Sequence, residues 1–283
     1  MKIGTTLYSY TAHFPIEQAA PMLVEDGFNA VDYSELCEVA GPLYEKSEKW
    51  MEETLAYEKK VLDGHGISIS QIHGPWRYPP MDGSAFERNQ WLMLMQRSVR
   101  AAALLGSPCV VVHPLMPFGA NSAQNPGFVI DCNAEHYARL CDYAKDYGVT
   151  VCLENMPFPL LPLAHVEQVC DFVDALGRKN LKVCLDTGHA NFCEMRAADA
   201  VRILGDRIAT LHIHDNDGTA DDHLSPLAGN IDFAAFGAAL HEIGFDGSLS
   251  SEAKSLRKLP KSKFRTEGRK IARLFKKIAE NKL

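Results

Sequence analysis

The sequence contains no long apolar run and no excess of basic residues. No segment approaches the roughly 20 consecutive apolar residues that a membrane-spanning helix needs, and the N-terminus, MKIGTTLYSYTAHFP, is too polar for a signal peptide. The formal net charge is -7 at pH 7, whereas proteins that bind nucleic acids or anionic membranes usually carry a basic surface. We therefore expect a soluble, cytoplasmic protein that has neither a nucleic acid nor a membrane as its partner.

The sequence also lacks cysteine motifs and domain breaks. No two of the eight cysteines have the C-x-x-C spacing of a redox motif or a structural zinc site. Cys152 and Cys184 lie within apolar segments, where cysteine behaves as a small hydrophobic residue. No linker or low-complexity segment divides the chain. These absences favour a reduced protein with a single domain over residues 1–283.

Short apolar segments alternate with amphipathic segments from one end of the chain to the other. The apolar segments predict eight strands, at residues 2–9, 30–35, 68–73, 109–113, 150–154, 182–186, 209–214 and 247–252. The amphipathic segments predict helices at 16–26, 49–64, 84–105, 133–147, 164–176, 197–204 and 232–243, and a last one near 261–279. Eight strand-and-helix units in about 250 residues are typical of an α/β protein with a single (β/α)8 TIM barrel.

Seven consecutive predicted strands end in an acid or a histidine, and barrel enzymes place their chemistry at these C-terminal strand ends. The residues are Glu35, His73, His113, Glu154, Asp186, His212 with His214, and Glu252. Carboxylates that converge on one mouth would repel one another unless a cation lay among them. The pattern therefore predicts a metal site, although His113 alone could be a structural histidine and Glu35 an exposed loop acid.

Glu154 and Asp186 each follow an apolar strand, so each lies where an unpaired charge is costly. Carboxylates together with an imidazole suit Mn²⁺, Zn²⁺, Co²⁺ or Mg²⁺. We expect one divalent ion of this group. His212 and His214 are two residues apart on one strand and should point the same way, so only one of them need bind the ion.

Seven stretches carry a family resemblance: QIHGPW (71–76), VVHPL (111–115), VCLENMPF (151–158), VCLDTGHANF (183–192), LHIHDND (211–217), DDHLSPLAGNIDF (221–233) and GSLSSEA (247–253). At these stretches the sequence resembles the xylose isomerase-like superfamily of TIM barrels, which includes sugar isomerases, ketose epimerases, inosose dehydratases and endonuclease IV. The resemblance implies that the metal ligands are Glu154, Asp186, His212 and Glu252. His212 is preferred to His214 because the family pattern there is a histidine, two residues and an acid. His189 resembles the family's substrate-contacting histidine.

The favoured hypothesis is a metal-dependent isomerase or epimerase of a ketose or a related polyol. In it the metal stabilises an enediolate, and Glu154 and Glu252 act as the catalytic acid and base. The residues expected to contact the small sugar substrate are Glu35, His73, Trp76, His113, His189, His214 and His223. Residues 114–131 are expected to form a loop at the mouth, and residues 155–163 an apolar wall. The basic segment 254–283 is interpreted as the solvated face of the last helix, or as a contact in a homo-oligomer.

Two other activities fit parts of the pattern. One is an inosose dehydratase-like lyase, which would use the same metal site. The other is an endonuclease IV-like zinc phosphodiesterase, whose two additional zinc ions would be held by His73, His113, His189 and the segment 221–223. The acidic net charge argues against the phosphodiesterase, as does the absence after His223 of the Gly-x-Gly spacing that endonuclease IV has there. A barrel that is only a binding subunit is disfavoured because the four costly acid and histidine positions are intact.

Overall fold

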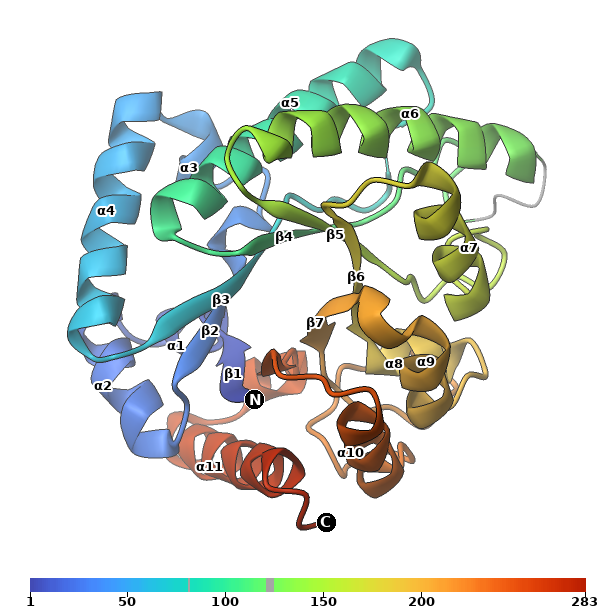
Figure 1. Cartoon of the computed structure of the whole chain (residues 1–283). Helices are drawn as coiled ribbons and strands as arrows, with labels where there is room; N and C mark the ends of the chain where they lie inside the picture. Colours follow the sequence, from blue (N-terminus) through green and yellow to red (C-terminus); the bar gives the residue numbers. More distant parts are fainter. Residues whose placement is uncertain (81, 121–124) are drawn as a thin grey trace.

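The computed structural model describes residues 1–80, 82–120 and 125–283. Within these ranges eight parallel strands form the predicted TIM barrel, in the spatial order β7-β6-β5-β4-β3-β2-β1-β8 (Figure 1). The strands are β1 (Lys2–Thr6), β2 (Ala30–Tyr33), β3 (Ser68–His73), β4 (Cys109–Val112), β5 (Thr150–Glu154), β6 (Leu181–Asp186), β7 (Ile208–His212) and β8 (Ser248–Ser251). A bridge between Ile213 and Ser251 joins β7 to β8 just beyond the two strands.

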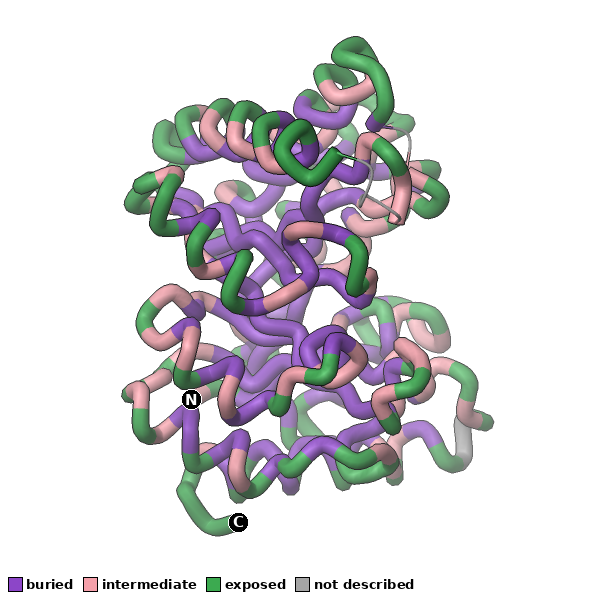
Figure 2. Tube along the Cα trace, turned by 90° about the vertical axis from the view of Figure 1, so that its right-hand side faces the viewer, coloured by how far each residue is buried: buried purple, intermediate pink, exposed green. Residues whose placement is uncertain are grey.

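Helices surround the strands and cover the outer face of the barrel (Figure 1). They are α1 (Tyr8–Thr11), α2 (Ile16–Asp26), α3 (Pro42–Glu45), α4 (Glu48–Gly64), α5 (Ala85–Leu105), α6 (Pro126–Lys145), α7 (Val166–Leu176), α8 (Thr187–Phe192), α9 (Ala197–Leu204), α10 (Phe233–Glu242) and α11 (Lys261–Ala279). Figure 2 shows buried residues running through the interior and exposed residues on the outer turns of the helices. None of the helices in the described ranges is long and apolar enough to cross a membrane.

The strands and helices differ from the predicted ranges mainly at their ends. β1 ends at Thr6, and the residues that follow turn into α1. α6 begins at Pro126, seven residues before the predicted start at residue 133, so part of the expected mouth loop is helical. Asn125 caps this helix by accepting a hydrogen bond of 3.2 Å from the Phe128 backbone N–H, and Pro126 stands at a position where its missing N–H costs nothing. Residues 121–124 of that loop lie outside the described residues.

The interior of the barrel is filled by small apolar side chains below the acidic strand ends. Cys109, Val111, Cys152 and Cys184 form one buried cluster. Side chains alternate along a strand, so Cys152 shares a face of β5 with Glu154, two residues further on. The prediction that Cys152 and Cys184 serve as small hydrophobic residues is confirmed, and this packing lies directly under the mouth of the barrel.

A buried acid ties the last helix to the start of the chain. Asp26, at the end of α2, accepts hydrogen bonds from Arg265 Nη2 at 2.7 Å and Arg269 Nε at 2.8 Å, both on α11. Its other oxygen accepts one from the Tyr10 hydroxyl at 2.9 Å. Burial and the neighbouring Asp26 charge raise the pKa of Tyr10, which therefore stays a donor. The network joins α11, at the end of the chain, to α1 and α2 at its start, so the outer layer of helices is continuous there.

We expect Asp26→Asn to lower the free energy of unfolding by about 1–3 kcal/mol, because the buried carboxylate that accepts hydrogen bonds from Tyr10, Arg265 and Arg269 would lose its charge and one acceptor oxygen. Urea denaturation measures the change. Glu25→Gln is the matched control, since Glu25 also contacts Arg265, at 2.8 Å, but its side chain is 62% exposed. The control should change stability by no more than ~0.5 kcal/mol. Equal losses of unfolding free energy in the two variants would contradict the conclusion that the buried Asp26 stabilises the fold more than the exposed Glu25 does.

Candidate active site and metal centre

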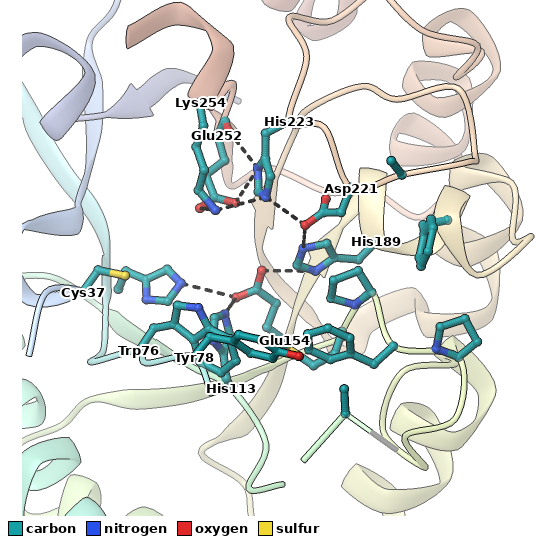
Figure 3. A pocket seen from close by; sticks show the side chains of 18 of the residues that line it. Cys37, Trp76, Tyr78, His113, Glu154, His189, Asp221, His223, Glu252 and Lys254 are labelled. Carbon is teal, nitrogen blue, oxygen red and sulfur yellow. Dashed lines mark hydrogen bonds and ion pairs between the residues drawn. The ribbon is translucent and has the colours of Figure 1, made fainter. Parts of the chain in front are cut away.

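A cavity of about 750 Å³ opens at the C-terminal ends of the strands. Of the residues predicted to form the site, the cavity is lined by His73, Trp76, His113, Glu154, His189, His223 and Glu252 (Figure 3). Asp186, His212 and His214 are fully buried and do not line the cavity. Glu35 lines a neighbouring cavity of about 450 Å³, where its carboxylate accepts a hydrogen bond from Thr11.

Four groups converge at the centre of the mouth. Glu154, Asp186 and His212 are the last residues of β5, β6 and β7, and Glu252 directly follows β8. Each offers one ligand atom, and these atoms all lie within 4.8 Å of one another. His212 Nδ1 lies 2.9 Å from Glu154 Oε1 and 3.6 Å from Glu252 Oε2. The structure thus brings together the four residues that the sequence predicts as metal ligands.

The chemistry of these four groups fits a divalent cation. Three of them are carboxylates, and all four residues are buried. Asp186 Oδ2 is buried and has no hydrogen-bond partner among the described residues. A buried carboxylate oxygen without a partner is strongly unfavourable, and a cation held by three oxygens and one imidazole nitrogen would satisfy it. The residues present therefore fit the ion that the sequence predicts.

Asp32 orients His212 and was missed by the sequence analysis. Its Oδ2 lies 3.0 Å from His212 Nε2 and accepts a hydrogen bond of 3.2 Å from Gln71 Nε2. Metal-binding histidines commonly donate their second ring N–H to a carboxylate in this way, which leaves Nδ1 of His212 facing the carboxylates. The sequence predicts Glu35 in this place because its apolar strand pattern extends to residue 35. The available signal was an acid inside the apolar strand of residues 30–33.

Asp186 is held in place by two neighbouring segments. Its backbone N–H donates to Asn155 Oδ1 at 2.8 Å, and Asn155 Nδ2 donates to its carbonyl at 3.1 Å. Its side chain caps α8 by accepting a hydrogen bond of 2.7 Å from the His189 backbone N–H. The His214 ring packs so close to Gly188 that a Cβ there would lie 1.9 Å from His214 Cε1. Only glycine fits at this point, so Gly188 lets His214 approach Asp186.

A second group of potential ligands lies beside the first. His189, His214, Asp221 and His223 offer ligand atoms within 4.8 Å of one another. Asp221 Oδ2 lies 3.5 Å from His189 Nε2 and 3.2 Å from His223 Nε2. Burial would raise the pKa of Asp221, but its hydrogen bonds to His189 and His223 outweigh burial and hold the pKa well below its usual range. Asp221 is therefore a carboxylate facing three imidazoles.

The histidines of β3 and β4 face Glu154 from the other side. His113 Nε2 lies 2.8 Å and His73 Nε2 lies 3.5 Å from Glu154 Oε2. His73 Nδ1 lies 2.7 Å from the Gly74 carbonyl oxygen, so it can donate there while Nε2 faces Glu154. Burial lowers the pKa of His113 to about 4, although the Glu154 charge opposes this. His113 is therefore a neutral imidazole at neutral pH.

Lys254 is a second residue that the sequence analysis missed. It lines the cavity, and its Nζ lies 3.2 Å from Glu252 Oε1 and 3.0 Å from His223 Nε2 (Figure 3). The interpretation of residues 254–283 as the solvated face of a helix is wrong for this residue. A short 3-10 helix, Lys254–Lys258, follows β8 before α11 begins, and it keeps Lys254 at the mouth. Many basic residues follow Lys254 in the sequence, so its position after the last strand did not distinguish it from them.

The fold and the mouth define a class of protein: a (β/α)8 barrel whose strand ends carry a carboxylate and histidine centre suited to a metal. The family model of the xylose isomerase-like TIM barrel matches residues 22–274, and the chain belongs to this family. The resemblance seen in the sequence is thereby confirmed.

The relatives of this chain include sugar epimerases. An uncharacterised protein of Methanocaldococcus jannaschii is 31% identical over 215 residues, which cover 74% of this chain and 72% of that protein. An L-ribulose 3-epimerase of Methylomonas sp. is 36% identical over 118 residues, 41% of this chain and only 39% of the enzyme. A crystal structure of a D-tagatose 3-epimerase-like protein superposes with a TM-score of 0.78 at 26% identity, and covers 100% of this chain and 98% of that one.

Proposed function

We propose that this protein is a divalent metal-dependent isomerase or epimerase of a ketose or a related polyol. One observation carries the proposal. Two buried glutamates, Glu154 and Glu252, belong to a single group of metal-type ligands and both line the same cavity. The kinship with proteins named as ketose 3-epimerases adds support.

The two glutamates are placed to move protons. Burial would raise the pKa of each glutamate. For Glu154 the charge of His212 and the hydrogen bonds from His113 and His212 outweigh burial, and for Glu252 the charges of Lys254 and His212 do so, which keeps both pKa values well below their usual range. Both are therefore carboxylates, able to remove a proton from the carbon next to a carbonyl. Return of the proton to the opposite face would give an epimer, and return to the neighbouring carbon would give an isomer.

The other groups of the mouth would serve the same chemistry. A divalent ion held by Glu154, Asp186, His212 and Glu252 would polarise the sugar oxygens and stabilise negative charge. The imidazoles of His73, His113, His189 and His223 line the cavity and can form hydrogen bonds with hydroxyl groups.

Solvent deuterium exchange tests the proposal directly. The protein is incubated in D₂O with Mn²⁺, Co²⁺, Mg²⁺ or Zn²⁺ and a set of ketohexoses and ketopentoses, and proton NMR follows loss of the C–H signal next to the carbonyl. We expect exchange with at least one ketose, together with a new epimer or isomer. No exchange with any ketose and any metal would refute the proposal, and a product that has lost water would indicate a lyase.

We expect His223→Ala to weaken substrate binding about tenfold, the equivalent of one lost hydrogen bond, and to leave the central metal in place. The KM of the exchanging ketose and the metal content of the purified variant are the measurements. His65→Ala is the matched control, because His65 is exposed at the end of α4 and remote from the cavity. Loss of an ion from the His223 variant would contradict this role and would make His223 a ligand.

A zinc phosphodiesterase is the second candidate, and one observation favours it. The group of His189, His214, Asp221 and His223 is itself suited to a metal and shares no member with the group of Glu154, Asp186, His212 and Glu252. The acidic net charge of -7 still argues against a nucleic acid as substrate. The number of ions per chain separates the two candidates.

A further inference from the structure

The large cavity has two unlike ends. Glu252, His223 and Lys254 lie together at one end (Figure 3). The other end is lined by apolar side chains from the segments that follow β3 and β5, here called the apolar wall: Trp76, Tyr78, Met156, Pro157, Phe158 and Leu160. Figure 3 shows Trp76 and Tyr78 beside His113, on the side of Glu154 away from Glu252 and Lys254.

The apolar wall has both an exposed surface and a rigid support. Tyr78 stacks on Phe158 with ring centroids 6.0 Å apart and an angle of 21° between the planes. The Tyr78 side chain is 63% exposed, and Leu160 is 57% exposed. Behind them, Trp76 and Phe158 pack on a separate buried cluster that includes Met156. Exposed apolar surface on a supported wall beside a cavity marks a binding surface.

The size of the cavity exceeds what a simple sugar needs. At about 750 Å³ it falls in the upper part of the ~300–1,000 Å³ range that accommodates drug-sized ligands. A six-carbon ketose, with about twelve non-hydrogen atoms, would fill only part of such a cavity. A ketose carries polar groups along its whole length, and its hydroxyls find partners at the acid and histidine end. The apolar wall would then face a part of the cavity that the ketose leaves empty.

We propose that the substrate is a keto-sugar or keto-polyol that carries a flat apolar substituent at the end remote from the reacting carbon. This inference rests on the proposed function and specifies its substrate class. The sugar part lies against Glu154, Glu252 and the histidines, and the substituent packs on Tyr78, Phe158 and Leu160. Aromatic rings stack favourably on such a substituent, and its burial removes apolar surface of both partners from water.

Binding of three probes to the metal-loaded protein tests the inference by calorimetry: D-fructose, 6-O-methyl-D-fructose and 6-O-benzyl-D-fructose. We expect the benzyl ether to bind about tenfold more tightly than the methyl ether, as burial and stacking of one ring would give. Tyr78→Ala and Leu160→Ala should reduce this ratio to about twofold or less. Both side chains are exposed, so neither variant endangers the fold.

Phe118→Ala is the matched control. Phe118 is also an exposed aromatic residue, but its ring packs at an angle of 45° against Phe128 and does not line the cavity. The control should keep the full preference for the benzyl ether. Equal binding of the two ethers, or a preference that survives in both wall variants, would overturn the inference.

Failure of the inference and failure of the proposed function are distinguishable. Deuterium exchange into a ketose without any benzyl preference would overturn only the substituent site. A benzyl preference that depends on Tyr78 and Leu160, without exchange into any of the three probes or any other ketose, would support the substituent site and refute isomerisation.

Discussion

Glu252→Gln is expected to reduce turnover by about 10²–10⁴-fold while the fold stays intact, and Glu154→Gln is expected to do the same. Glutamine has nearly the same shape as glutamate, but its amide cannot take up the proton of a C–H group. Both side chains are buried at the mouth and line the cavity, so the loss falls on the chemical step. The deuterium exchange rate measures the effect, and circular dichroism reports the fold.

Glu38→Gln is the matched control for these two variants. Glu38 is an exposed acid that lines only the neighbouring cavity, and its Oε1 accepts a hydrogen bond from the Ala40 backbone N–H that glutamine can keep. It should exchange at the wild-type rate. A near-normal rate in either the Glu154 or the Glu252 variant, with metal still bound, would show that the mechanism does not use two glutamates.

Removal of divalent metal is expected to abolish deuterium exchange and to lower the melting temperature. Without a cation, the carboxylates of Glu154, Asp186 and Glu252 lie close together in a buried site. An ion present at 100 times its Kd would stabilise the fold by about 2.7 kcal/mol. Dialysis against a chelator, followed by differential scanning calorimetry and addition of single metals, measures both effects. Full activity after chelation would refute metal dependence.

The number of bound ions should be one per chain, of Mn²⁺, Co²⁺, Mg²⁺ or Zn²⁺. Asp186→Asn and Asp221→Asn form a matched pair for this measurement, because each aspartate belongs to a different group of potential ligands. We expect the Asp186 variant to lose the ion and the Asp221 variant to keep it. Three Zn²⁺ per chain, with loss from both variants, would favour the phosphodiesterase.

The barrel could be predicted because its strands and its longer helices leave local signals in the sequence. The strand that ends at Glu154 is a run of apolar residues, and the structure ends β5 at that residue. Glycines such as Gly106, with φ of +70°, stop the helices where the sequence expects. The position of an acid at the end of a buried strand is equally local, so Asp186 and Glu252 could also be predicted to lie at the mouth.

The features that could not be predicted from the sequence depend on the register between strands and on how deeply a side chain is buried. The pairing of β2 with β3 shifts between Val31 and Asp32, and no sequence pattern announced this irregularity. Asp32 lies in the centre, whereas Glu35 lies in the 3-10 helix Ser34–Leu36 that follows β2. His214 and His212 lie two residues apart, yet neither lines the cavity, because both lie beneath its floor. Whether a side chain lies above or below that floor depends on packing between distant segments.

The bridge of Ile213 with Ser251 also makes β7 and β8 the seam of the barrel. Neighbouring strands elsewhere share ladders of paired residues, whereas here two hydrogen bonds, from Ile213 N–H and Glu252 N–H, close the ring. His212 lies on one side of this seam and Glu252 on the other. An ion held by both would therefore link two strands that are joined by a bridge rather than a ladder, so that the proposed catalytic groups would also help to keep the barrel closed.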